Sequence, residues 1–155
     1  VSSQAGRRPF ALMSHYCATK YALNGLSESM AHELAQFNIR VTLIEPGTVI
    51  TPIFGKGNSI PEDEKDYSIF QGRMIRQVTK GLTELGCGPD IIAKCMVDFV
   101  TTKDPKLHYL IDKDAVDNVD IYNKYGPETW VSDGKILDDE EFFSTMKDRY
   151  GYEIG

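Results

Sequence analysis

Apolar residues recur every four positions over residues 14–37, which is the spacing of one face of an amphipathic helix. Residues 39–46, IRVTLIEP, are instead rich in β-branched side chains and end at a proline, which cannot continue a hydrogen-bonded ladder. We therefore predict a long helix over 14–37, followed by a strand over 39–46. We expect the core to contain the apolar stripe of this helix, which consists of Ala18, Ala22, Leu26, Met30 and Leu34, with Leu23 beside it.

Further along the chain, four segments carry a local pattern. Residues 47–60 contain three glycines and a proline, which favours a loop. Residues 61–82 open with a proline and four acids, which suit the N-terminus of a helix, and residues 107–112, LHYLID, favour a short strand. A further helix is predicted over residues 89–102, where one face collects Ile91, Ile92, Cys95, Met96 and Phe99.

The order of these elements indicates the fold class. A strand, a long crossover helix and a second strand predict parallel pairing with a right-handed connection, and hence an α/β layered domain. The opening residues 1–3, VSS, are then expected to end the strand that precedes the first helix. Because a parallel sheet needs helices on both faces and more strands than these, we expect the N-terminal part of the fold to be missing.

The character of the chain changes after Ala115. Residues 116–155 are acidic, aromatic and weakly patterned, and only the segment DDEEFFSTMKDRY has a helical pattern. We therefore divide the chain into a domain of residues 1–115 and an acidic C-terminal extension of residues 116–155. The extension is expected to be partly disordered or to pack through Ile121, Tyr122, Trp130 and Phe142.

Charge and composition exclude several classes of protein. A net charge of -6 and a pI near 5.0 argue against nucleic-acid binding, which relies on clustered Lys and Arg. The apolar runs are far shorter than the roughly 20 residues that cross a bilayer, and we expect no signal peptide, because the sequence does not open with a basic start followed by an apolar stretch. Three cysteines without a C-x-x-C spacing and three scattered histidines predict neither disulfides nor a metal site. These features favour a cytoplasmic location.

Three landmarks in the sequence suggest chemistry at the carboxyl ends of the strands, where open α/β sheets bind their ligands. Ser3 follows the first strand, and the segment PGTVIT (46–51) follows the next. Tyr16 and Lys20 lie one helical turn apart and therefore share a face. A phenol titrates near pH 10, and a fixed ammonium close to it lowers its pKa, so that Tyr16 would move protons while Ser3 holds a carbonyl oxygen.

Each landmark also has a simpler interpretation when it is taken alone. A Y-x-x-x-K spacing arises often by chance, and such a pair is more often a solvated contact of a few tenths of a kcal/mol. Ser3 alone is typical of a helix cap or a turn, and Thr51 suits a turn with Pro52. The ordered set is what makes the catalytic interpretation stronger than these alternatives.

The set S-x12-Y-x3-K, formed by Ser3, Tyr16 and Lys20 and followed by RVTLIEPGTVIT, resembles the active-site half of a short-chain dehydrogenase/reductase of the classical subgroup. The resemblance covers residues 1 to about 115. It includes LHYLIDKDA, which is similar to the closing strand of members that act on steroid, retinoid or other lipid-like alcohols. The resemblance implies the C-terminal half of a doubly wound parallel-sheet Rossmann fold.

The resemblance also implies roles for individual residues. Ser3 would orient the substrate oxygen, Tyr16 would be the catalytic acid-base, and Lys20 would lower the pKa of the tyrosine and bind the nicotinamide ribose. The implied reaction is reversible hydride transfer between NAD or NADP and an alcohol with its carbonyl, without a metal. Beside Tyr16 and Lys20, the implied cofactor contacts are Pro46, Gly47, Thr48, Val49 and Thr51. Beside Ser3, the residues implied to line a hydrophobic substrate pocket are Ile53, Phe54, Ile60, Phe70 and Met74.

The sequence also departs from the family pattern. The glycine-rich cofactor turn, the residue that selects NAD or NADP and the asparagine of the catalytic tetrad would all precede Ser3, and GKGN (55–58) lacks Rossmann or P-loop spacing. A truncated fragment without activity, or a binding module, is therefore an alternative. A sugar-nucleotide epimerase or dehydratase is another, although PGTVIT speaks against it. The resemblance further implies a homodimer or homotetramer, because the helix at 14–37 commonly contributes to a subunit interface in this family.

Overall fold

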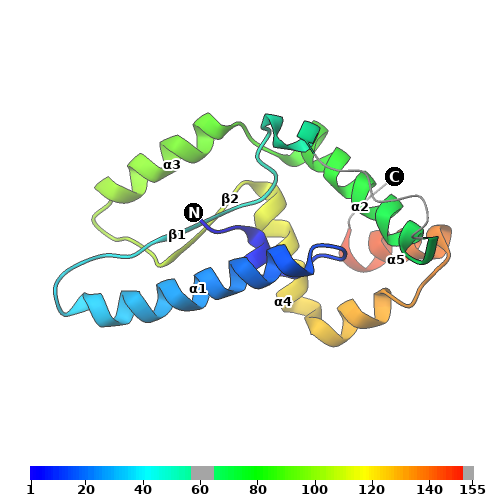
Figure 1. Ribbon diagram of the computed structural model, residues 1–155, viewed down its shortest axis with the longest axis horizontal. Helices are drawn as coiled ribbons and strands as arrows, with labels where there is room; N and C mark the ends of the chain where they lie inside the picture. Colours follow the sequence, from blue (N-terminus) through cyan, green and yellow to red (C-terminus); the bar gives the residue numbers. More distant parts are fainter. Residues whose placement is uncertain (57–64, 152–155) are drawn as a thin grey trace.

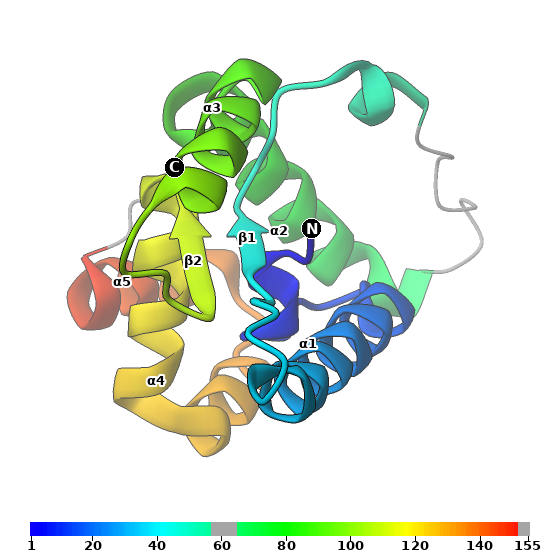
Figure 2. The same cartoon turned by 90° about the vertical axis from the view of Figure 1, so that its left-hand side faces the viewer.

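A short parallel sheet lies at the centre of the computed structural model, which describes residues 1–56 and 65–151. Strand β1, Leu43–Pro46, pairs in parallel with β2, His108–Ile111. Helices α1, Ser14–Ala35, and α3, Pro89–Thr101, lie on opposite sides of the two strands (Figures 1 and 2). The structure therefore confirms the α/β class and the parallel pairing, with strands shorter than predicted.

The N-terminal residues occupy the place expected for a third strand. The backbone N–H of Ser2 donates to the carbonyl of Ile44 over 2.8 Å, so the opening segment lies along β1. A single turn of 3-10 helix, η1, Gln4–Gly6, follows directly. The segment before α1 therefore ends beside the carboxyl end of β1, as a parallel arrangement requires.

The remaining elements form the crossover from β1 to β2 and the C-terminal part. Two single turns of 3-10 helix flank residues 57–64, and part of the predicted 47–60 loop and of the predicted 61–82 helix lies outside the described residues. Helix α2 passes directly into a π-helical turn, η4. The bounds are η2, Pro52–Lys56; η3, Lys65–Tyr67; α2, Ser68–Lys80; η4, Gly81–Leu85; α4, Lys113–Asp133; and α5, Asp139–Tyr150.

A small apolar core joins α3 to the sheet. Its centre is formed by Ile44, Ile92 and Ile111, one from each of β1, α3 and β2. The rings of Phe99 and Tyr109 stack at its edge with their centroids 3.7 Å apart. The predicted apolar face of the helix at 89–102 is thus confirmed, except for Ile91, which is exposed.

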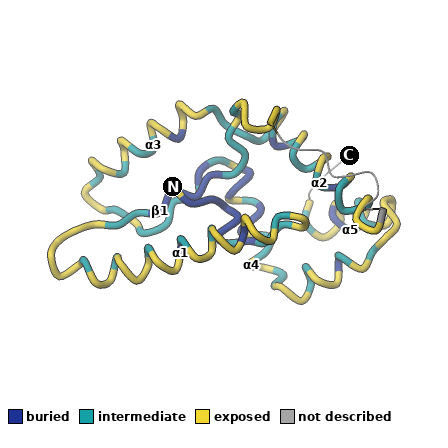
Figure 3. The backbone as a smooth tube through the Cα atoms, viewed as in Figure 1, coloured by how far each residue is buried: buried dark blue, intermediate teal, exposed yellow. Residues whose placement is uncertain are grey.

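The apolar stripe of α1 is not in the core, and that expectation is wrong. Leu26 is 58% exposed and Met30 is 41% exposed, and most of the helix is open to solvent (Figure 3). The buried residues of α1 are Cys17 and Asn24, on the side that faces η1 and β1. The helix is thus buried along a narrow, partly polar line, while its widest apolar face has no covering element among the described residues.

The C-terminal part is more regular than the sequence indicates. Helix α4 begins at Lys113, so it crosses the predicted boundary at Ala115, and residues 116–133 are helical rather than weakly structured. Asp112 caps the helix, because its carboxylate accepts from the N–H of Ala115 over 2.8 Å. A kink at Gly126, with φ 81°, followed by Pro127, divides α4 into two pieces, residues 113–125 and 127–133, and so breaks the period of the whole helix. Helix α5 agrees with the predicted helical segment.

Candidate functional site

Ser3 is held by the turn that follows it. Its hydroxyl oxygen accepts from the N–H of Ala5 over 3.2 Å, which caps η1 and fixes the side chain. The residue is buried, and it lines a cavity of about 900 Å³. Because the oxygen accepts from Ala5, the hydroxyl hydrogen is available to a group inside the cavity.

Tyr16 and Lys20 lie one turn apart near the start of α1. The ammonium of Lys20 is 5.5 Å from the centroid of the Tyr16 ring, and it lies 3.5 Å from the carbonyl oxygen of Val1. Tyr16 lines the same cavity as Ser3. Lys20 is absent from the cavity wall and lies beside the tyrosine that lines it.

Asp114 connects the serine segment to the loop after β1. One oxygen of its buried carboxylate, Oδ2, accepts from the N–H and the hydroxyl of Thr48, both over 3.0 Å, and from the amide of Gln4 over 2.9 Å. Its other oxygen accepts from Asn118 over 2.8 Å. The position of Thr48 at the cavity wall is therefore set by the same side chain that holds the residue after Ser3.

The loop after β1 has no room for a side chain at Gly47. A Cβ atom there would lie 2.6 Å from Oδ1 of Asp112 and 2.7 Å from Oδ2 of Asp114, closer than any real carbon contact. Beyond it, the N–H of Cys87 donates to the carbonyl of Thr48 over 3.1 Å, which anchors the loop to the start of α3. Pro46 is buried, and neither Pro46, Val49 nor Thr51 lines the cavity.

Asp112 and Cys87 form a half-buried pair beneath this loop. The thiol of Cys87 donates to Oδ2 of Asp112 over 3.6 Å. Burial, followed by the negative charge of Asp112 and this hydrogen bond, raises the pKa of Cys87 to about 11. Burial is also the main cause that raises the pKa of Asp112 above its usual range. The pair is therefore structural rather than nucleophilic, because a reactive cysteine needs a lowered pKa.

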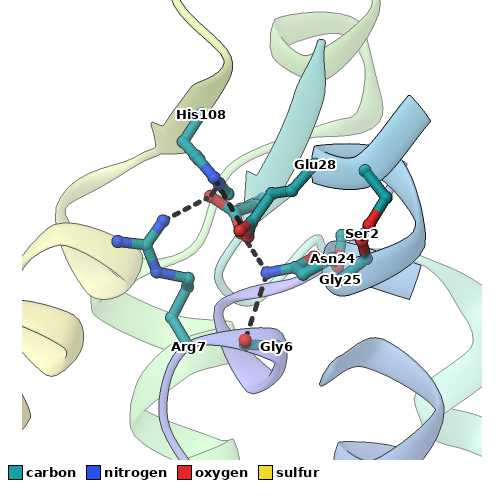
Figure 4. A network of polar contacts seen from close by, with 9 residues as sticks. Ser2, Gly6, Arg7, Asn24, Gly25, Glu28 and His108 are labelled. Carbon is teal, nitrogen blue, oxygen red and sulfur yellow. Dashed lines mark hydrogen bonds and ion pairs between the residues drawn. The ribbon is translucent and has the colours of Figure 1, made fainter. Parts of the chain in front are cut away.

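A second polar network lies on the buried side of helix α1, which faces away from solvent (Figure 4). Asn24 donates from its amide to the carbonyl of Gly6 over 3.1 Å and to Glu45 over 2.6 Å, and it accepts from the hydroxyl of Ser2 over 2.6 Å. Glu45 is fully buried, and His108 lies 3.1 Å from its second carboxylate oxygen. The network joins α1, the serine segment and β1 at one point, and no sequence pattern pointed to it.

The cavity contains most of the residues predicted to contact substrate. The wall includes Ile53 and Phe54 from η2 and Phe70 and Met74 from α2, together with Ser3. Ile60, which was also predicted there, lies outside the described residues. Of the predicted cofactor contacts, Tyr16, Gly47 and Thr48 are in the wall. The structure thus brings the serine, the tyrosine and the apolar positions to one space, and their roles there stay predictions.

A large part of the same wall comes from the segment that we expected to be an appended extension. Aromatic and apolar residues of α4 and α5 face the cavity, and the guanidinium of Arg8 lies 4.6 Å from the Trp130 ring centroid and 4.7 Å from that of Phe10. The signal that could have found them is the density of aromatic residues in an otherwise acidic segment. The main ones are Tyr122, Tyr125, Trp130, Phe142, Met146 and Tyr150.

Two negative findings apply to the described residues alone. Within residues 1–56 and 65–151, no group of three or more His, Cys, Asp or Glu side chains is arranged to hold a metal ion. In the same ranges, no helix is both long enough and apolar enough to cross a membrane.

Comparisons with known proteins agree with these observations. A family profile described as short chain dehydrogenase matches residues 1–61. The oxidoreductase BOA17 of Botryotinia fuckeliana (strain B05.10) is 31% identical over 76% of this chain and 43% of its own length. Human retinol dehydrogenase 8 is 31% identical over 69% of this chain and 37% of its own length.

A solved structure shows the same arrangement in space. A short-chain dehydrogenase from Streptomyces avermitilis superposes with a TM-score of 0.68 at 33% sequence identity, covering 87% of this chain and 49% of that protein. The chain spans about half the length of this structure and less than half of the two relatives above. The chain therefore belongs to the short-chain dehydrogenase/reductase family of oxidoreductases, and it spans part of the family's fold.

Proposed function

We propose that these residues are the catalytic half of an NAD(P)-dependent enzyme that interconverts an alcohol and a carbonyl by hydride transfer. The observation that carries the proposal is that Ser3 and Tyr16 line one cavity, while the ammonium of Lys20 lies 5.5 Å from the Tyr16 ring. A hydroxyl, a phenol and a fixed positive charge are the groups that a proton transfer to a carbonyl oxygen needs.

The three residues would divide the work as follows. The hydroxyl hydrogen of Ser3 donates to the substrate oxygen, because the serine oxygen is already held by Ala5. Tyr16 gives a proton to that oxygen during reduction and takes it back during oxidation. The charge of Lys20 favours the phenolate that remains after the proton has left.

The residues present fit the nicotinamide end of a cofactor and not its other end. The cofactor, when bound, supplies or accepts the hydride. Gly47 and Thr48 line the same cavity as Tyr16, and the lack of a side chain at Gly47 lets the loop pack closely against Asp112 and Asp114. No glycine-rich turn of dinucleotide spacing occurs in the sequence, so we expect the pyrophosphate to be held outside these 155 residues.

The isolated chain of 155 residues is therefore expected to bind neither NAD nor NADP at micromolar concentration. Calorimetric titration with each dinucleotide is the direct measurement. Saturable micromolar heat would contradict the view that the phosphate-binding part lies elsewhere. The complete protein, titrated in parallel, should bind one of the two.

The substrate is expected to be a hydrophobic alcohol or ketone, because the cavity wall is largely aromatic and aliphatic. The name of retinol dehydrogenase 8, a relative, refers to an alcohol of this kind. The exposed stripe of α1, including Leu26 and Met30, supports a homodimer or homotetramer of the complete protein. The net charge of -6 supports the expectation of no nucleic-acid partner, and the three cysteines without a C-x-x-C spacing support the expectation of a cytoplasmic location.

The deciding experiment replaces Tyr16 by Phe in the complete protein. We expect the rate of carbonyl reduction to fall by about a hundredfold or more, because general acid-base catalysis typically contributes that much. Tyr21→Phe, on the same helix and outside the cavity wall, is the matched control. An unchanged rate in Tyr16→Phe would refute the proposal. Ligand binding without turnover in the unaltered complete protein would favour a binding module instead.

A further inference from the structure

Arg73 is the most deeply buried charged residue of helix α2. It lies on α2 and is only 7% exposed. Its Nε donates to Oδ1 of Asp139 over 2.8 Å, and its Nη1 donates to the carbonyl of Ile136 over 2.9 Å. Burying a guanidinium is unfavourable unless its donors are paired, so this geometry is tightly specified.

The remaining contacts of Arg73 go to the same turn. Its Nη2 lies 3.4 Å from the carbonyl oxygens of Leu137 and Asp138, and its guanidinium lies 3.8 Å from the ring centroid of Phe142. Residues 134–138 connect α4 to α5, and Asp138 caps α5 by accepting from Glu141 over 2.9 Å. The side chain of Arg73 therefore contacts both the segment that connects α4 to α5 and the first helical turn of α5.

The turn matters for the cavity because α5 forms part of its wall. Phe142, Met146 and Tyr150 of α5 line the same cavity as Ser3 and Tyr16, and so does Arg73 itself. In Figure 1, α2 and α5 both lie at the end of the molecule away from α3, and the contacts of Arg73 with Asp139 and Phe142 join them. The position of this wall relative to α2 consequently depends on how firmly the turn is held.

We propose that Arg73 is a specificity-determining residue, which positions the α4–α5 turn so that the cavity accepts a substrate with a long apolar group. The inference rests on the proposed function in one respect: the reacting end of that substrate is placed at Ser3 and Tyr16. The far end of an alkyl or polycyclic group lies against the aromatic wall of α4 and α5. Short substrates do not reach that wall, so Arg73 affects their binding less than that of long ones.

The single tryptophan of the chain provides a direct readout. Trp130 lines the cavity, so its fluorescence reports binding in the 155-residue chain without a cofactor. The probes are methyl nonyl ketone, which has a long apolar chain, and acetone, which has none. Calorimetry on the same samples separates binding from optical artefacts.

Arg73→Met is the main variant, since it keeps an unbranched apolar stem and removes every donor. We expect methyl nonyl ketone to bind about tenfold more weakly, because losing contact with about two methylene groups is sufficient for that change. Arg76→Met is the matched control. Arg76 is exposed on the same helix and contacts α5 through the Phe143 ring at 4.9 Å, and its replacement should change the affinity by less than about twofold.

Three outcomes would overturn the proposal. In the first, folded Arg73→Met binds methyl nonyl ketone with wild-type affinity. In the second, Arg76→Met loses as much affinity for this ketone as Arg73→Met does. In the third, the wild-type chain shows no saturable binding of the ketone. If Arg73→Met fails to fold by circular dichroism, Asp139→Asn answers the same question, because it weakens one partner of the arginine at a half-exposed site. Wild-type affinity in that variant would then refute the proposal.

Kinetics of the complete protein provide the second readout. Arg73→Met should raise the KM for methyl nonyl ketone by a clearly larger factor than the KM for acetone. A loss that is equal for both ketones would indicate a general structural role instead. Binding of the long ketone without any turnover would contradict the proposed function and still leave the role of Arg73 in the cavity supported, so the two failures are distinguishable.

Discussion

Asn24 and Glu45 share a hydrogen bond of 2.6 Å that ties helix α1 to strand β1. Glu45 has no exposed surface and directly precedes the Pro46–Gly47 loop. Asn24 also donates to Gly6, so the tie extends to the segment that carries Ser3. The three parts of the candidate site are thus fixed to one another from behind, by a pair of residues that do not line the cavity.

Replacing Asn24 by Ala should destabilise the fold. The change removes both donors and leaves the carboxylate of Glu45 buried with fewer partners, since His108 and Arg7 are the others. We expect the free energy of unfolding to fall by about 2–3 kcal/mol, because unsatisfied buried polar groups cost about 1–3 kcal/mol each. Urea unfolding of the 155-residue chain measures the change.

Ser29→Ala is the control for this experiment. Ser29 is exposed on the same helix, and its hydroxyl donates to the carbonyl of Gly25 within that helix over 3.0 Å. Its replacement should change the free energy of unfolding by less than about 0.5 kcal/mol. If Asn24→Ala were no less stable than Ser29→Ala, the hydrogen bonds of Asn24 that join helix α1 to β1 would not contribute to stability, and the prediction would be wrong.

Asp114 should contribute at least as much as Asn24 to the stability of the fold. Its carboxylate accepts from four donors on Gln4, Thr48 and Asn118, and all four would lose an acceptor in Asp114→Ala. We expect a loss of about 2–4 kcal/mol in the free energy of unfolding, since bonds to a charged acceptor contribute about 1.5–3 kcal/mol each and partly compensate when lost together. Thermal unfolding followed by circular dichroism is a suitable measurement.

Asp117→Ala tests whether that loss is specific. Asp117 lies on the same helix, and its partner is the exposed Lys113 one turn away. Exposed pairs of this kind contribute about 0–1 kcal/mol, so the control should stay close to the wild type. Similar losses in both variants would mean that helix α4 is sensitive to any lost carboxylate, and the role inferred for Asp114 would be wrong.

The elements that the sequence predicts correctly are those with a local period. The helix at 14–37, the strand before Pro46 and the helix from Pro89 follow from spacing alone, because their patterns repeat within one element. Helix α4 was missed because Gly126 and Pro127 interrupt its pattern in the middle. The exposed stripe of α1 shows a second limit of prediction from the sequence. A periodic pattern indicates that one face of a helix is apolar, but it does not indicate which element covers that face.

The candidate site divides in the same way. Ser3, Tyr16 and Lys20 are visible in the sequence because their spacing is a linear motif. The contacts of Arg73, in contrast, join α2 to a turn more than sixty residues later in the chain. Neither segment has a sequence pattern that predicts this contact. A buried glutamate such as Glu45 is equally hidden, because charged residues are rarely expected inside a fold.

Cys87 should make stability depend on pH at the alkaline end. Its pKa rises from 9.0 to about 11, so the folded state prefers the neutral thiol. The resulting stabilisation is fully present below pH 9 and is lost as the pH rises from about 9 to about 11. Over that range we expect the free energy of unfolding of the wild type to fall more steeply than that of Cys87→Ala, measured in parallel by urea unfolding. Equal slopes would contradict the prediction.

Asp112→Asn isolates the cause of this pKa shift. Asparagine keeps an oxygen that can accept from Ala115, and it tolerates the φ of 74° at this position. It removes the negative charge that disfavours the thiolate, so the pKa of Cys87 should move back toward 9.0. Alkylation of Cys87 by iodoacetamide at pH 9, followed by mass spectrometry, should therefore be faster in Asp112→Asn than in the wild type. A rate equal to that of the wild type would mean that burial alone holds the thiol neutral.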